Sequence, residues 1–199
     1  MFLEPRYGGQ CSGWIEVITG CMFSGKTEEL LRRLRRSNFA GQKIIIFKPA
    51  TDDRYSSNEV VSHDSTSMSS LVIKESRVIL EHAQDYQVIG IDEGQFFDDQ
   101  LIAISEKLAL LGKRVIIAGL DLDYKGIPFG PIPNLMAIAE YVTKVHAICS
   151  HCGNLATHSY RFAEESDLVL VGEKDKYEPR CRHCYAMGNI LDLRIKKDS

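Results

Sequence analysis

Eight consecutive residues near the start of the chain have the types and spacing that bind phosphate. They fit the pattern G-x-x-x-x-G-K-[ST], and they are Gly20, Cys21, Met22, Phe23, Ser24, Gly25, Lys26 and Thr27. In this pattern, backbone N–H groups surround phosphate oxygens, the lysine supplies a positive charge and the final hydroxyl reaches Mg²⁺. The loop is therefore predicted to bind a nucleotide, with Thr27 as a magnesium ligand.

Asp92 and Glu93 form a second candidate group, directly after the apolar run at residues 88–91. An acid at the end of a strand downstream of a phosphate loop completes a nucleotide site. We expect Asp92 to hold Mg²⁺, directly or through water, and Glu93 to be free to accept a proton. Together with the loop, this pair favours triphosphate hydrolysis or phosphoryl transfer over an inert nucleotide fold.

Four of the six cysteines form two C-x-x-C pairs, Cys149 with Cys152 and Cys181 with Cys184. Two such pairs are typical of one tetrahedral Zn²⁺ site. The segment between them, residues 153–180, is longer than the ~15–20 residues usual in such sites, which predicts a loop held between the pairs. Redox-active pairs are the main alternative, and His151 or His183 could replace a neighbouring cysteine as ligand.

The order of apolar runs predicts an α/β fold with a parallel sheet. Strands are expected at residues 14–19, 43–48, 71–73, 88–91 and 114–118, and helical segments at 27–39, 78–83 and 98–111. The polar stretch at residues 49–70 is predicted to be a long loop. Composition changes near Ala147, which divides the chain into a nucleotide-binding domain at residues 1–147 and a zinc domain at residues 148–199.

Length, composition and charge exclude several classes of protein. The 199 residues, 44% of them apolar, suffice for one ordinary domain with a small appendage. A net charge of -3 gives no general attraction to nucleic acid or anionic membrane, and the arginines at residues 32–36 are expected to form a solvated helix face. Without a long apolar stretch or a leader-like N-terminus, we expect a cytoplasmic protein with no nucleic-acid or membrane partner.

Several short segments, taken in order, resemble the cytosolic thymidine kinase family, the zinc-containing P-loop type. They are residues 22–23 in the loop, 48–50 with 53–57, 92–97, 119–121 with 128–130, and 175–177 before Cys181. The resemblance runs from about residue 13 to residue 185. It implies a RecA-like P-loop parallel sheet with helices on both faces and a small C-terminal zinc-ribbon-like domain that carries a lasso loop. It also implies a homotetramer that uses ATP, Mg²⁺ and Zn²⁺.

The resemblance further implies transfer of the ATP γ-phosphate to the 5′-hydroxyl of thymidine, and of deoxyuridine as a further acceptor, in nucleotide salvage and DNA precursor synthesis. Glu93 would be the general base, and Lys26 and Arg54 the cations at the transferred phosphate. A surface role for Arg54 remains the alternative. Nucleotide contacts would be completed by Asp92, Glu93, Gly94 and Gln95.

The family's nucleoside pocket falls on apolar and aromatic residues: Met22, Phe96, Leu120, Tyr124, Phe129 and Tyr177. The lasso, whose main-chain groups would bind the base edge, falls on Leu168, Val169, Leu170, Val171 and Gly172. Phe97 is assigned to the core. Departures from the family pattern are Cys21, which is expected to make the loop oxidisable, the hydroxyl of Tyr124, and Glu173-Lys174 in the lasso.

Two other functions compete with nucleoside phosphorylation. A RecA-type NTPase would use Glu93 to activate water, but it would have no use for an aromatic pocket. A zinc-ribbon module for nucleic acid would use the region from Cys149 to Cys184 as its platform, although no basic and aromatic face accompanies it. Because the phosphate loop lies far from the cysteines in sequence, we also expect it to be independent of the zinc domain.

Overall fold

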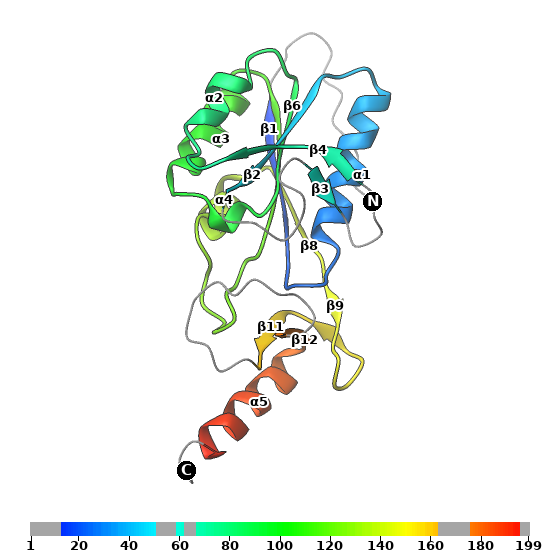
Figure 1. Ribbon diagram of the computed structural model, residues 1–199, viewed down its shortest axis with the longest axis vertical. Coiled ribbons are helices and arrows are strands. Elements are labelled where there is room, and N and C mark those ends of the chain that lie inside the picture. Colours follow the sequence, from blue (N-terminus) through cyan, green and yellow to red (C-terminus); the bar gives the residue numbers. More distant parts are fainter. Residues whose placement is uncertain (1–12, 51–58, 62–66, 163–175, 196–199) are drawn as a thin grey trace.

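The computed structural model describes residues 13–50, 59–61, 67–162 and 176–195. A body built around one sheet lies at one end of the elongated molecule, and the C-terminal elements lie at the other (Figure 1). Arg54 and the lasso, residues 168–172 with Glu173-Lys174, lie outside the described residues.

The sheet has six strands, and all five neighbouring pairs are parallel. In spatial order they are β5 (Leu71–Ile73), β2 (Ile44–Pro49), β6 (Val88–Ile91), β7 (Arg114–Gly119), β1 (Trp14–Thr19) and β8 (Tyr141–Lys144). The central strands are apolar on both sides, as expected when helices cover both faces of a parallel sheet. This arrangement confirms the predicted α/β class.

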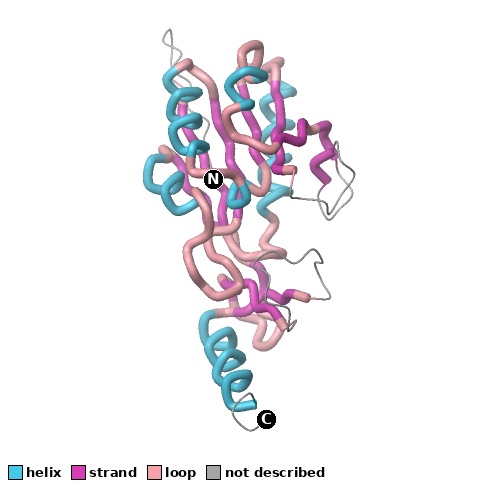
Figure 2. The backbone as a smooth tube through the Cα atoms, turned by 60° about the vertical axis from the view of Figure 1, so that its left-hand side comes forward, coloured by secondary structure: helices cyan, strands magenta, loops and turns pink. Residues whose placement is uncertain are grey.

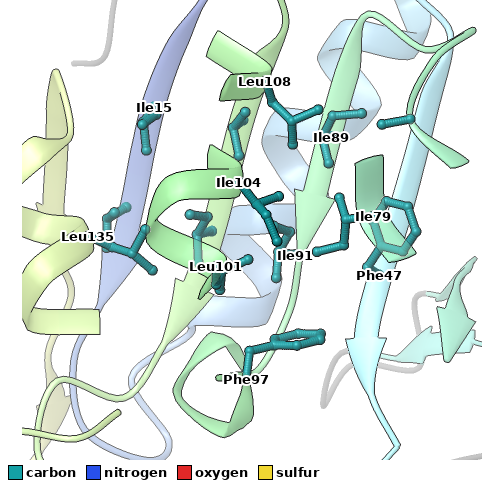
Figure 3. Close-up of a cluster of buried hydrophobic side chains, with 14 of the residues drawn as sticks. Ile15, Phe47, Ile79, Ile89, Ile91, Phe97, Leu101, Ile104, Leu108 and Leu135 are labelled. Carbon is teal, nitrogen blue, oxygen red and sulfur yellow. The ribbon is translucent and has the colours of Figure 1, made fainter. Parts of the chain in front are cut away.

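Helices cover the sheet on both faces. One face packs against α1 (Lys26–Phe39), which places Leu30, Leu31 and Leu34 on the sheet. The other face packs against α2 (Val78–His82), α3 (Gln100–Leu110) and α4 (Ile132–Ile138). Helix α3 lies over β1 and β7, and its Leu101, Ile104 and Leu108 belong to this larger cluster (Figure 3). Each fully buried side chain of this kind stabilises the fold by about 1.5–3 kcal/mol relative to exposure.

The arginines of α1 depart from the predicted solvated face. Arg32 and Arg36 are exposed, but Arg33 is buried and donates to Glu16 on β1 at 2.7 Å. Glu16 is 0% exposed and also accepts from Arg114 at 2.7 Å. A carboxylate buried between sheet and helix needs charged partners, so the prediction is wrong for Arg33.

The polar stretch at residues 49–70 is not the uninterrupted loop that was predicted. It contains β3 (Glu59–Val61) and β4 (Ser67–Ser69), which pair antiparallel. Strands of three residues are too short to give a recognisable alternation of polar and apolar side chains. The sequence prediction also left α4 and β8 unassigned, because both are short and half-exposed.

The C-terminal elements form what we call the cysteine unit, residues 147–162 and 176–195. It contains the pair β9 (Ala147–Ile148) and β10 (Leu155–Ala156), the pair β11 (His158–Arg161) and β12 (Tyr177–Arg180), and helix α5 (Arg182–Ile195). Figure 2 shows α5 extending away from the rest of the molecule. The unit lies near the carboxyl end of β1, where the phosphate loop starts (Figure 1).

Candidate functional site

The phosphate loop connects β1 to α1, so the strand before it and the helix after it are both present. Its backbone has positive φ at Gly20 (148°), Phe23 (63°) and Gly25 (84°). A Cβ at Gly20 would lie 2.2 Å from the carbonyl oxygen of Val145, so glycine is required there. These turns bring the loop to the N-terminus of α1, where free N–H groups favour an anion.

Lys26 and Ser24 both point back into the loop. The Lys26 ammonium donates to the carbonyl oxygen of Cys21 at 2.9 Å, and the Ser24 hydroxyl donates to the same oxygen at 2.7 Å. Lys26 is thus already inside the loop, where it can exchange this carbonyl for a phosphate oxygen.

Thr27 and Asp92 meet at the start of α1, as predicted for a magnesium site. The Thr27 hydroxyl lies 3.4 Å from both carboxylate oxygens of Asp92, which is buried at the end of β6. Hydroxyl and carboxylate oxygens are hard ligands that suit Mg²⁺, which usually keeps waters and phosphate oxygens as its other ligands. The two side chains therefore fit the ion.

Glu93 is held in one orientation by its neighbours. It has a φ of 51°, uncommon for a residue with a side chain, and its N–H donates to Asp92 at 3.0 Å. One carboxylate oxygen accepts from the Gln95 amide at 2.5 Å. Residues in this backbone region persist where their surroundings fix them, and they cluster at functional sites.

Gln95 connects the candidate base to the candidate nucleoside pocket. Its side chain is 2% exposed, its amide nitrogen donates to Glu93, and its carbonyl oxygen accepts from the N–H of Leu120 at 2.9 Å. Gly94, Gln95 and Phe96 form the short 3₁₀ helix η1 (Gly94–Phe96), which follows β6 after Asp92 and Glu93. The loop after β6 and the loop after β7 are thereby joined through one amide.

The predicted aromatic wall residues are found in two groups. Phe96 and Phe129 make an edge-to-face contact at 5.6 Å between ring centroids. Tyr124 is covered by the guanidinium of Arg161 at 3.5 Å, and its carbonyl accepts from the hydroxyl of Tyr185 at 2.8 Å. Tyr177 is buried on β12, and Phe97 is buried in the core as predicted.

Three residues that the sequence analysis did not single out hold parts of this site. Arg161 and Tyr185 both contact Tyr124, and the Ser159 hydroxyl accepts from the N–H of Met22 at 3.0 Å. Tyr185 directly follows Cys184, so its place beside a predicted metal ligand could have drawn attention to it. Nothing in the sequence distinguishes Ser159 or Arg161 from ordinary polar residues of a short strand.

The four predicted cysteines come together in one cluster. The Sγ atoms of Cys149, Cys152, Cys181 and Cys184 lie within 4.8 Å of one another, and those of Cys152 and Cys181 are 3.6 Å apart. A tetrahedral ion with Zn–S bonds of ~2.3 Å needs sulfur atoms roughly 3.8 Å apart, so the cluster fits zinc. Within the described residues, neither His151 nor His183 belongs to it, and a single four-sulfur group favours a metal over two redox pairs.

The electrostatics of the cluster also favour a cation. Burial raises the pKa of Cys149, but backbone hydrogen bonds from Cys181, Cys152 and His151 outweigh this effect and lower the pKa to about 6. The pKa of Cys184 is raised to about 12, chiefly by its hydrogen bond with Cys152 and then by burial and the other thiols. Four adjacent thiols oppose each other's ionisation, and a bound cation would remove that cost.

Cys21, which was expected to make the loop oxidisable, is a buried thiol. It is 2% exposed, and its Sγ lies 3.4 Å from the carbonyl oxygen of Ala156. Burial raises the pKa of this thiol, and the thiolate is the form that reacts with oxidants. Both observations argue against oxidation at this position, because the cysteine unit covers this part of the loop.

Comparison with known proteins gives consistent matches over most of the chain. The family model described as thymidine kinase matches residues 13–185. A thymidine kinase of Bacteroides fragilis is 59% identical over 173 residues, 87% of each chain, and one of Bacteroides thetaiotaomicron is 58% identical over the same shares. A thymidine kinase of Rhodothermus sp. is 53% identical over 188 residues, 93% of this chain and 88% of the relative.

The helices that the structure describes are all too short or too polar to span a bilayer. The matched range contains the phosphate loop, the Asp92-Glu93 pair and all four clustered cysteines. By sequence, the chain belongs to the thymidine kinase family.

Proposed function

We propose that this chain transfers the γ-phosphate of ATP to the 5′-hydroxyl of thymidine, giving thymidine monophosphate and ADP. Deoxyuridine is a second acceptor, and the reaction serves nucleotide salvage and DNA precursor synthesis. The relatives named thymidine kinase support this proposal. The observation that carries it is the Glu93 carboxylate, fixed one residue after Asp92, whose side chain reaches Thr27 of the phosphate loop.

In the proposed mechanism, Glu93 takes the proton of the 5′-hydroxyl as that oxygen forms its bond to the γ-phosphorus. The bond between the γ-phosphorus and the oxygen bridging to the β-phosphate breaks, and ADP leaves. The loop N–H groups and Lys26 offset charge on the transferred group, and Arg54 is proposed as a second cation. Thr27 and Asp92 would hold Mg²⁺, which neutralises charge on the phosphates when bound.

The nucleoside is proposed to lie among the aromatic and aliphatic side chains that follow the sheet strands. Phe96 and Phe129 suit the faces of a flat pyrimidine. The Gln95 side chain accepts from the N–H of Leu120 and so holds Leu120 near the segment that carries Phe96. The remaining proposed wall residues are Met22, Tyr124 and Tyr177. Main-chain groups of residues 168–172 would read the base edge, and a mismatched base would leave buried groups unpaired.

The cysteine cluster is proposed to bind one structural Zn²⁺ and to fix both ends of the segment that carries the lasso. On this basis we propose a division into a RecA-like domain at residues 1–147 and a zinc domain at residues 148–199. The four thiols must stay reduced to bind metal, which supports a cytoplasmic location.

We also propose a homotetramer. Among the described residues, β8 pairs within the sheet only with β1, and Val142 on β8 is exposed. A free strand edge of this kind can pair with another chain. Light scattering on the purified protein at several concentrations tests the assembly.

ATP consumption with each deoxynucleoside in turn tests the proposed reaction. The proposal predicts rapid turnover with thymidine, lower turnover with deoxyuridine and little without an acceptor. An NTPase would consume ATP equally well with no nucleoside present. Turnover that is independent of thymidine would therefore refute the proposal in favour of water as the acceptor.

A further inference from the structure

The phosphate loop is attached to the cysteine unit at two consecutive residues. The N–H of Met22 donates to the Ser159 hydroxyl at 3.0 Å, and Cys21 Sγ lies 3.4 Å from the carbonyl oxygen of Ala156. Cys21 also packs in one buried cluster with Ala147, Cys149, Ala156 and Cys181. Ser159 is 3% exposed, so its hydroxyl is committed to an interior contact. The two parts are therefore not independent, contrary to the expectation from their separation in sequence.

This attachment lies next to the strained residue of the loop. Phe23 follows Met22 and has a φ of 63°, a conformation that costs about 1–3 kcal/mol for a residue with a side chain. Such a conformation persists only when neighbouring contacts impose it. The two residues before Phe23 are both held by the cysteine unit, and Gly25 and α1 hold the chain after it.

We propose that Ser159 is a positioning residue that holds the phosphate loop in its ATP-binding shape. The inference rests on the proposed role of residues 20–27 as the loop that binds ATP. The N–H of Met22 is directed to Ser159, which fixes the peptide that leads into Phe23 and the rest of the loop. The cysteine unit thereby serves the nucleotide side of the reaction as well as the nucleoside side.

The position of Ser159 is set by the strand that leads to the clustered cysteines. Ser159 is the register partner of Pro179 on β12, and β12 ends at Arg180, next to Cys181. The carbonyl of Arg180 also accepts from the N–H of Thr157 at 3.1 Å. Any ion that fixes the cysteine cluster would therefore fix β11 and, through Ser159, the loop.

Ser159→Ala tests the proposal with two readouts. Hydrogen exchange followed by NMR should show the Met22 amide protected in the wild type and exchanging at least about tenfold faster in the variant. The Kd for a non-hydrolysable ATP analogue with Mg²⁺ should rise by about 3- to 10-fold, the effect of losing one hydrogen bond. The KM for ATP should rise by a similar factor, with kcat at saturating ATP within about threefold.

Two matched variants separate positioning from a general loss of structure. Ser159→Thr keeps the hydroxyl and should restore both readouts towards the wild type. Ser150→Ala removes an exposed serine of the same unit, which bonds Glu178 and the carbonyl of Pro179 rather than the loop, so it should leave both readouts unchanged.

Three outcomes would overturn the proposal. The first is a Met22 amide that exchanges freely in the wild type, a result that needs no variant and does not depend on folding of Ser159→Ala. The second is a Kd for the ATP analogue that Ser159→Ala leaves unchanged. The third is a defect in thymidine affinity alone. If the ATP analogue failed to protect any amide of residues 23–27 in the wild type, the assigned loop itself would be wrong, whatever the role of Ser159.

Discussion

Replacement of Gln95 by alanine removes the side chain that joins the candidate base to the nucleoside pocket. Gln95→Ala deletes the donor to the Glu93 carboxylate and the acceptor for the Leu120 N–H. A hydrogen bond to a charged group contributes about 1.5–3 kcal/mol, and 1.36 kcal/mol corresponds to a factor of ten. If that bond serves to orient Glu93, kcat should fall by about 10- to 100-fold.

The same substitution should also lower stability. It leaves the N–H of Leu120 without its acceptor at a partly buried position, which costs about 1 kcal/mol of the free energy of unfolding. It also frees the loop after β7, so the KM for thymidine should rise. Steady-state kinetics with both substrates and urea unfolding on the same preparation measure all three effects.

Gln100→Ala provides the matched control, because Gln100 is an exposed residue at the start of α3. It should change kcat by less than about twofold and the free energy of unfolding by less than about 0.5 kcal/mol. A Gln95→Ala enzyme with lowered stability but a kcat within about threefold of wild type would refute the reasoning. Gln95 would then support the fold without orienting Glu93.

Three further predictions concern the loop, the metal and the pH dependence of stability. Lys26→Ala should abolish phosphoryl transfer while the circular dichroism spectrum and melting temperature stay near those of the wild type, because the lysine supplies a positioned charge. Elemental analysis should find about one zinc per chain. Cys181→Ser should lower the zinc content and raise the KM for thymidine and the KM for ATP. A fully active enzyme without zinc would contradict this prediction. Burial, with the nearby charge of Arg182, lowers the pKa of His158 below 6.5, so the unfolded state binds the proton more readily. The contribution of neutral His158 to the free energy of unfolding is therefore present above pH 6.5 and lost as the pH falls below it. Urea unfolding from pH 7.5 to 5 should show a smaller loss of stability in His158→Gln than in the wild type.

The parts of the site that depend on neighbouring residues in sequence could be predicted. The phosphate-binding groups of the loop all lie between Gly20 and Thr27, so the sequence pattern identifies the loop without a structure. The cysteine pairs are local in the same way, and a tetrahedral ion needs two of them to meet. The apolar strands likewise predicted the parallel sheet, because only strands buried on both faces are apolar throughout.

Contacts between distant segments could not be predicted. Ser159 bonds Met22 across 137 positions of sequence, and neither residue has a type that requires the other. The sequence pattern placed Arg33 on a charged surface. Its partner, Glu16, can be identified only once it is known which side chains of β1 face α1. Cys21 looked reactive for the same reason, since its cover is supplied by Ala156 of the cysteine unit. Burial in these cases is a property of the assembled fold.

The most direct test of the account is the single-turnover rate of Glu93→Gln with ATP and thymidine. The amide keeps the shape of the side chain and its contact with Gln95 but cannot accept the proton of the 5′-hydroxyl. We predict that equilibrium binding of ATP and thymidine remains within a few-fold of wild type while the rate of thymidine monophosphate formation falls by roughly 10²–10⁴. A fall of less than about fivefold would mean that Glu93 is a structural acid, and the proposed mechanism would be wrong.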